Sequence, residues 1–274
     1  GLWYFVGLVG QLAILLSLFL LHLPVAAGFL LVAGLMLLTM LLTCFNTREP
    51  TRLAPSAPAA SHWDELKQAA QGLKTLRQMR IYLLTFFLYG VGIDAVVPNL
   101  SLFIQNVTHC SDTLASAMPI ALLACAALGS APFGWLSDRI GPKRLLMASL
   151  AMIALAALGG LWVHSLLTVG LVLALAGLGT AAQNASAFPL LTRLVPAEEV
   201  GFYTGLQTAA LSVAGPLSIW GTGALVNHQH HDYRLIFLVC FLGIAASLLS
   251  LRFVRLSAAP DEIAARRLLS QRRT

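Results

Sequence analysis

The chain has 274 residues, of which 58% are hydrophobic and only 10% are charged. Ordinary soluble domains carry roughly a quarter charged residues, so this composition excludes a protein whose surface mainly contacts water. The formal net charge is +6. Contact of basic loops with anionic lipid accounts for this charge without any role for nucleic acid.

Apolar segments that are long enough to cross a bilayer follow one another along the chain. A hydrocarbon core of about 30 Å needs roughly 20 helical residues. Charged residues and Pro, Asn or His separate the segments. The predicted spans are residues 2–21, 25–45, 81–106, 114–136, 144–163, 166–191, 201–226 and 234–254. The sequence therefore predicts an all-α membrane protein of about eight transmembrane helices.

The basic residues lie almost entirely in alternate connections between these spans. Sixteen of the seventeen Lys and Arg residues lie on one side, in residues 46–80, 137–144 and 252–273 or at Arg193, and only Arg234 lies on the other. Cytoplasmic loops carry an excess of Lys and Arg. We therefore expect a multi-pass protein of the plasma or inner membrane with both termini in the cytoplasm.

The longest polar stretch, residues 46–80, separates the second predicted span from the third. Its first part is rich in small residues and Pro, as in a linker. After Ser61, a residue type favoured at helix N-caps, apolar residues recur at helical spacing. We expect an amphipathic helix on the cytoplasmic membrane surface here, and a cytoplasmic tail at residues 256–274.

Asp94 is the only one of eleven acidic residues that lies in the middle of a predicted span. A carboxylate at this depth is costly unless it is paired, protonated or hydrated. We expect Asp94 to bind a coupling proton or another cation, or else to bond a neighbouring helix as a structural partner. Pro98 and Asn99 follow one turn later, and a proline inside a span frees a carbonyl that can line a cavity, so Asn99 is a second candidate.

A charged motif with two glycines connects the fourth and fifth predicted spans. We expect its glycines to form a tight turn and its charged side chains to bond neighbouring helix ends. The residues that carry the pattern are Gly134, Asp138, Arg139, Gly141, Lys143 and Arg144. In order, spacing and cytoplasmic position, this segment resembles the signature loop of the major facilitator superfamily.

The resemblance implies a fold of two six-helix bundles joined by a long cytoplasmic loop, with the motif acting as a conformational latch. Residues 81–255 would be the complete C-terminal bundle, and residues 1–45 the last two helices of an N-terminal bundle whose first four helices are missing. We therefore expect a partial fold of this family. The family's substrate cavity lies between the two bundles, so the absence of most of one bundle could prevent transport.

Amide side chains inside the predicted spans are further candidates for substrate binding. They are Gln183, Asn184, Gln207 and Gln11. Such amides can bond the hydroxyl groups of a polar solute, and they equally bond neighbouring helices in membrane proteins. The sequence leaves both roles open.

These features predict a secondary active transporter that moves a small polar solute, such as a sugar or another metabolite, by alternating access. A proton or sodium ion would be the coupling ion, in symport. Two alternatives stay open, namely a drug or metabolite exporter of the same fold and a non-transporting, truncated membrane protein. The sequence shows no nucleotide-binding or hydrolase motif, so we expect no enzyme activity, no cofactor and no metal site.

Overall fold

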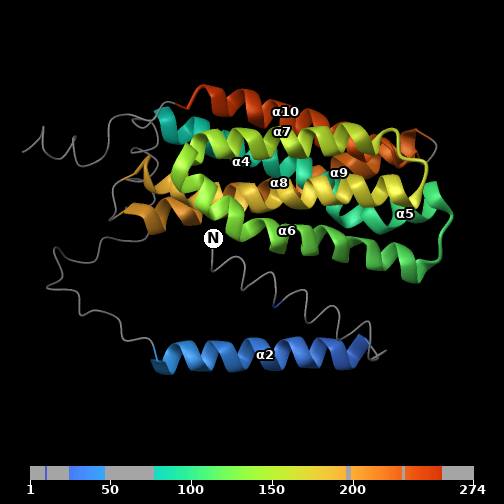
Figure 1. Cartoon of the computed structure of the whole chain (residues 1–274), viewed down its shortest axis with the longest axis horizontal. Helices are drawn as coiled ribbons and strands as arrows, with labels where there is room; N and C mark the ends of the chain where they lie inside the picture. The colour runs from blue at the N-terminus through green and yellow to red at the C-terminus, as the bar shows by residue number, and fades with distance from the viewer. Residues whose placement is uncertain (1–9, 11–24, 47–76, 196–198, 230–231, 255–274) are drawn as a thin grey trace, which may run out of the picture. The chain divides into compact units, whose positions relative to one another are not determined.

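The computed structural model describes residues 10, 25–46, 77–195, 199–229 and 232–254 (Figure 1). All regular structure in these residues is helical. Six helical segments among them are long and apolar enough to cross a membrane, which confirms the predicted all-α membrane fold. The predicted span at 2–21 with Gln11, the amphipathic helix of the linker and the C-terminal tail lie outside the described residues.

The chain divides into two compact units. Residues 9–75 form one unit, and its main described element is the helix α2, Val25–Asn46, of 22 residues. The hydroxyl of Thr39 donates to the carbonyl of Leu35, one turn earlier in the same helix, at 2.9 Å. This polar group is thus satisfied within α2, as a bilayer requires.

The second unit is a bundle of six spanning segments. The first segment is interrupted and consists of an α-helix, a short 3₁₀ helix and a second α-helix. The elements are α4 (Arg77–Val96), η1 (Val97–Asn99), α5 (Leu100–Thr108), α6 (Asp112–Ile140), α7 (Pro142–Gly160), α8 (Leu166–Thr192), α9 (Val200–His228) and α10 (Leu235–Arg252). The six segments, the first of which comprises α4, η1 and α5, lie close to the six spans predicted after the linker.

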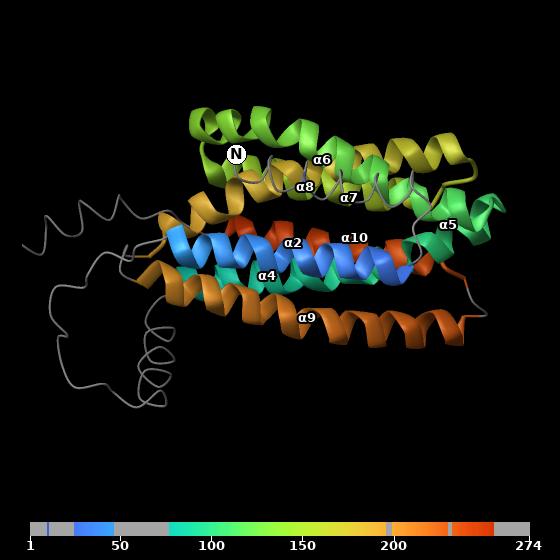
Figure 2. The same ribbon diagram turned by 90° about the horizontal axis from the view of Figure 1, so that it is seen from below.

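Two groups of helices make up the bundle. In one group α4 packs against α9 and α10, and in the other α8 packs against α6 and α7. Contact between α7 and α10 joins the groups, which lie on opposite sides of the bundle in Figure 2. Because α4 and α9 both begin at the same end, they run side by side in the same direction.

The first segment of the bundle is interrupted at Pro98. A proline has no N–H, so the carbonyl of Asp94 loses its usual helical donor. The chain forms the 3₁₀ helix η1 at this point and then resumes as α5. The side-chain amide of Asn99 donates to the carbonyl of Ala95 at 3.1 Å, across the break.

The turn of the charged motif differs from the predicted loop at 137–144. α6 continues to Ile140 and α7 begins at Pro142, so Gly141 is the whole connection. Gly141 has φ +88°, a conformation that glycine adopts readily, and Pro142 suits the first position of a helix. Gly134 lies within α6, so the expectation that it forms part of the turn is wrong.

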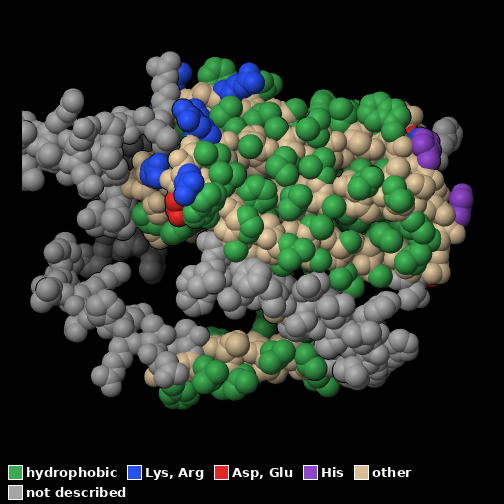
Figure 3. Space-filling view, viewed as in Figure 1, with side chains coloured by type: hydrophobic (Ala, Val, Ile, Leu, Met, Phe, Trp, Pro, Cys, Tyr) green, Lys and Arg blue, Asp and Glu red, His purple; other side chains and the backbone are tan. Residues whose placement is uncertain are grey.

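Charge separates the two ends of the bundle in Figure 3, with Lys and Arg gathered at one end and His at the other. We call the end where α6 meets α7 the basic end, and the other the histidine end. Most of the described Lys and Arg residues lie at or near helix termini of the basic end, whereas Arg234 lies at the histidine end. The basic-end residues are Arg77, Arg80, Arg139, Lys143, Arg144, Arg193 and Arg252.

Candidate functional site

Asp94 lies on α4 one turn before the η1 break, and its side chain is half-buried. Its carboxylate faces α9, because a Cβ atom built on Gly215 would lie 3.1 Å from the Oδ2 atom of Asp94. No hydrogen bond or ion pair joins this carboxylate to any residue in the described part of the chain. The structural alternative, a bond to a neighbouring helix, therefore has no partner there.

Close contacts fix α9 against α4 around Asp94. A Cβ atom on Gly90 of α4 would lie 2.9 Å from the Cβ atom of Ala214. The hydroxyl of Ser218 donates to the carbonyl of Val91 at 2.5 Å, and this bond crosses from α9 to α4. We call this contact the α4–α9 seam, made by Gly90, Val91 and Asp94 on α4 and by Ala214, Gly215 and Ser218 on α9.

The two adjacent amides of α8 lie apart from this seam. Gln183 is buried, with 7% of its surface exposed, whereas Asn184 is half-buried. Gln183 borders a narrow interior void whose lining comes from α4, α7, α8 and α10 and includes no residue of α9. Neither amide side chain forms a hydrogen bond with the described residues. Their role in binding a substrate stays a prediction.

Gln207 takes part in a junction of three helices near the basic end. The hydroxyl of Tyr82 on α4 lies 3.1 Å from the Oε1 atom of Gln207 on α9 and 3.0 Å from the carbonyl oxygen of Ala187 on α8. Tyr82 is fully buried. This contact ties Gln207 to the packing of the bundle, and its role toward a substrate stays a prediction.

Two charged side chains of the motif make contacts: Lys143 reaches the end of α10, and Arg139 contacts a residue of its own helix. The ammonium of Lys143 donates to the carbonyls of Val254 at 2.5 Å and Arg252 at 3.3 Å. A cation at a helix C-terminus also interacts favourably with the helix dipole, so Lys143 stabilises the end of α10. The guanidinium of Arg139 lies 3.8 Å from the ring centroid of Trp135 in the preceding turn.

The other charged residues of the motif, Asp138 and Arg144, are exposed. Neither forms an ion pair within the described residues, so the bonds that we expected from Asp138 to helix ends are not present there. The role of the motif as a conformational latch stays a prediction.

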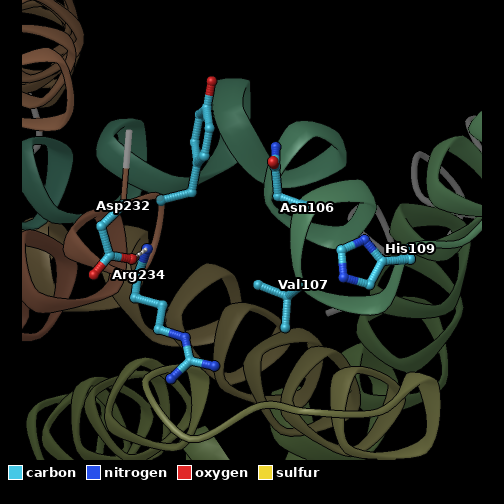
Figure 4. Close-up of a pocket in the computed structure, with 6 residues that line it drawn as sticks. Asn106, Val107, His109, Asp232 and Arg234 are labelled. Atoms are coloured by element: carbon cyan, nitrogen blue, oxygen red, sulfur yellow. Dashed lines mark hydrogen bonds between the residues drawn. The ribbon is translucent and has the colours of Figure 1, made fainter. Parts of the chain in front are cut away.

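The sequence alone gave no sign of a hollow at the histidine end, shown in Figure 4. Its volume is about 360 Å³, and its lining comes from the C-terminal end of α5 and from the connection between α9 and α10. The lining residues are Asn106, Val107, His109, Asp232, Tyr233 and Arg234. The two parts of the lining are more than a hundred residues apart in sequence. Only the isolated position of Arg234 among the basic residues could have drawn attention to this hollow.

Contacts at this hollow hold Arg234 in place. The backbone N–H of Arg234 donates to the Oδ1 atom of Asp232 at 3.0 Å. Its guanidinium lies 3.2 Å from the Nδ1 atom of His164 in the connection between α7 and α8. The Arg234 side chain therefore ties the start of α10 to a neighbouring turn.

Comparison with known proteins identifies relatives of most of the chain. Residues 82–272 match the model of the Major Facilitator Superfamily. The probable nitrate/nitrite transporter NarK2 of Mycobacterium tuberculosis is 30% identical over 183 residues, which cover 63% of this chain and 44% of that protein. The multi-drug resistance efflux pump PmrA homolog of Lactococcus lactis is 27% identical over 198 residues, or 69% of this chain and 47% of that one.

Solved structures show the same fold. A transporter of the Major Facilitator Superfamily, FucP, in the outward conformation has a TM-score of 0.66 at 17% identity, covering 85% of this chain and 55% of that one. A second structure, of the E. coli fucose:proton symporter FucP, has a TM-score of 0.67 at 16% identity. The chain thus spans about half the length of the relatives that it matches.

Proposed function

The chain belongs to the major facilitator superfamily, and from this premise we propose that it is part of a secondary active transporter for a small polar solute. Transport proceeds by alternating access and is driven by symport of a proton or another cation. The solute is a sugar or another small metabolite. The six-helix bundle contributes one side of the translocation path, because substrate sites in transporters of this family lie between two bundles. No covalent step is involved.

The observation that carries this proposal is the state of Asp94. Its carboxylate is half-buried within a spanning segment and has no hydrogen-bond or ion-pair partner among the described residues. A charged group at the centre of a bilayer costs about 2.5–3.5 kcal/mol or more. Binding of a proton or another cation removes this cost, and an ion that binds one conformation more tightly than the other shifts the equilibrium between them.

The proposed setting is a cell membrane, either plasma or inner, with the basic end and both chain termini in the cytoplasm. The gathering of Lys and Arg at the basic end supports this orientation, because basic residues are enriched on the cytoplasmic side. The same residues lie at the level of anionic lipid headgroups.

Solute uptake by proteoliposomes tests this function. The protein, expressed from its complete reading frame, is reconstituted and exposed to an imposed pH gradient or sodium gradient. The tested solutes are sugars, nitrate, nitrite and lipophilic cations. Wild type is compared with Asp94→Asn and with the control Asp112→Asn, because Asp112 is exposed at the start of α6.

We expect Asp94→Asn to lose accumulation driven by the gradient and to keep exchange of solute across the membrane. Asp112→Asn should behave as wild type. If Asp94→Asn shows the same gradient-driven uptake as wild type, Asp94 has no coupling role. If no solute moves in any preparation, the uptake function fails, and the exporter and the non-transporting membrane protein take its place.

A second candidate function is export of drugs or metabolites by the same fold. The similarity to a multi-drug resistance efflux pump homolog favours it, at 27% identity over 69% of the chain. In the same assay, competition by lipophilic cations and transport out of the compartment facing the basic end would identify an exporter.

A further inference from the structure

Gly215 of α9 lies directly against the carboxylate of Asp94. A Cβ atom built on Gly215 would lie 3.1 Å from the Oδ2 atom and 3.7 Å from the Cγ atom of Asp94. No other atom that the structure describes outside the local stretch of α9 comes within 4 Å of that Cβ position. The space beside Gly215 is therefore occupied by this one carboxylate.

The helices on both sides of this contact are held together. Before it, a Cβ atom on Gly90 would lie 2.9 Å from Ala214 and 3.1 Å from Leu211, so α4 and α9 already touch. After it, the hydroxyl of Ser218 bonds the carbonyl of Val91. Interiors of this density resist local expansion. A side chain at position 215 would therefore displace the half-buried carboxylate and not the helix.

We infer that Gly215 is a positioning residue for Asp94. Because Gly215 has no side chain, the carboxylate of Asp94 can lie against the backbone of α9. The position of the carboxylate there determines how tightly it binds the coupling ion. The inference rests on the proposed function of Asp94 as the coupling carboxylate. Gly215 acts through Asp94 and does not itself touch the ion or the solute.

The test compares side chains of increasing size at two glycines of α9. Gly215→Ala and Gly215→Val place one and three carbon atoms in the space of the carboxylate. Gly221→Ala and Gly221→Val are the matched controls, because nothing lies within 4 Å of a Cβ atom built on Gly221. Both positions lie inside the same helix, so both substitutions gain helix propensity over glycine, and the gain is smaller at Gly215 because this residue precedes Pro216. The Pro216 contribution is the same with or without the Asp94 carboxylate.

The pH dependence of uptake by proteoliposomes reports a change in the surroundings of the Asp94 carboxylate, because these set its affinity for a proton. In the Gly215 variants we expect the pH of half-maximal uptake to be displaced by about half a unit or more, and further for Val than for Ala. Exchange of solute should persist, and the Gly221 variants should follow wild type. If Gly215→Val does not fold, the comparison between Gly215→Ala and Gly221→Ala decides.

A second measurement does not depend on transport. Thermal unfolding in detergent is compared for wild type, Gly215→Ala, Asp94→Ala and the double variant. If the two residues act through contact, Gly215→Ala lowers the midpoint in the wild-type background and has no such effect once the carboxylate is removed. Equal effects in the two backgrounds would overturn the inference.

The two proposals fail in different ways. If Asp94→Asn loses coupling while the Gly215 variants follow the Gly221 variants, Gly215 has no positioning role and the proposed function stands. If Asp94→Asn keeps full coupling, the proposed function of Asp94 fails. The thermal comparison then still decides whether Gly215 fixes the place of the carboxylate.

Discussion

Individual polar side chains in this bundle have different surroundings, although several looked alike in sequence. The hydroxyl of Tyr82 bonds α8 and α9, and Gln207 accepts one of these bonds. The side chains of Asp94 and Gln183 form no hydrogen bond with the described residues. Buried polar groups in proteins are usually bonded, so groups left without a partner in a transporter are the better candidates for ion or solute binding.

Removal of the Tyr82 hydroxyl should loosen the three-helix junction. Tyr82→Phe deletes the donor to Ala187 and Gln207 and keeps the ring, so we expect a loss of about 1 kcal/mol of stability. The measurement is the thermal unfolding midpoint of the purified protein in detergent. Tyr89→Phe is the control, because the Tyr89 hydroxyl has no hydrogen bond within the described residues. Equal midpoints for the two variants would show that the junction contributes nothing.

The helices pack most closely where glycines lie at their crossing points. α4 and α10 meet at Gly92 and Gly243, where a Cβ atom built on Gly243 would lie 2.9 Å from the Cα and from the N atom of Gly92. Nearby, the hydroxyl of Ser247 on α10 donates to the carbonyl of Thr85 on α4 at 2.8 Å. Small residues and cross-helix hydrogen bonds are the usual means by which membrane helices associate. These contacts make α10 a fixed support for α4.

Addition of one methyl group at this crossing should destabilise the bundle. In Gly243→Ala the new Cβ atom meets backbone atoms of α4, which cannot rotate away as a side chain can. We expect a cost of about 1–3 kcal/mol, as for overpacked cores. Gly170→Ala in α8 is the control, because nothing lies within 4 Å of its Cβ position. A midpoint of thermal unfolding for Gly243→Ala at or above that of Gly170→Ala would contradict the close approach.

At the scale of the whole molecule, the charge difference between the two ends predicts a fixed orientation in the membrane. Gly201 and Gln229 lie at opposite ends of α9 and are both exposed. We expect Gln229→Cys to react with a membrane-impermeant maleimide in intact cells, and Gly201→Cys to react only after the membrane is opened. The substitutions are made in a background without the native cysteines Cys44, Cys110, Cys125 and Cys240.

Two features make these positions suitable. Nothing lies within 4 Å of a Cβ atom built on Gly201, and Gln229 is the exposed C-cap residue that follows α9, so neither new side chain disturbs packing. Labelling of Gly201→Cys from outside, with Gln229→Cys protected, would reverse the orientation that the basic residues predict.

The sequence by itself determined the fold class, the family and the limits of most spans. The length of each apolar segment and the alternation of basic loops can be read from the linear sequence. The thickness of the bilayer and the enrichment of basic residues on the cytoplasmic side convert them into spans and an orientation without any tertiary contact. The charged motif at 134–144 indicated the family, which the match of residues 82–272 confirmed. Pro98 marked the break in the first span of the bundle, because a proline lacks the backbone N–H that a continuous helix needs, whatever its tertiary surroundings.

Only the tertiary structure decided which side chains meet. The sequence singled out Asp94, yet it could not show that Gly215, on a helix more than a hundred residues later, lies against the carboxylate. It grouped Gln207 with Gln183, and the structure placed Gln207 in a junction with Tyr82 and Gln183 beside a separate void. Contacts of this kind depend on the rotation and register of packed helices. These are set by the fit of whole surfaces, which no local pattern records.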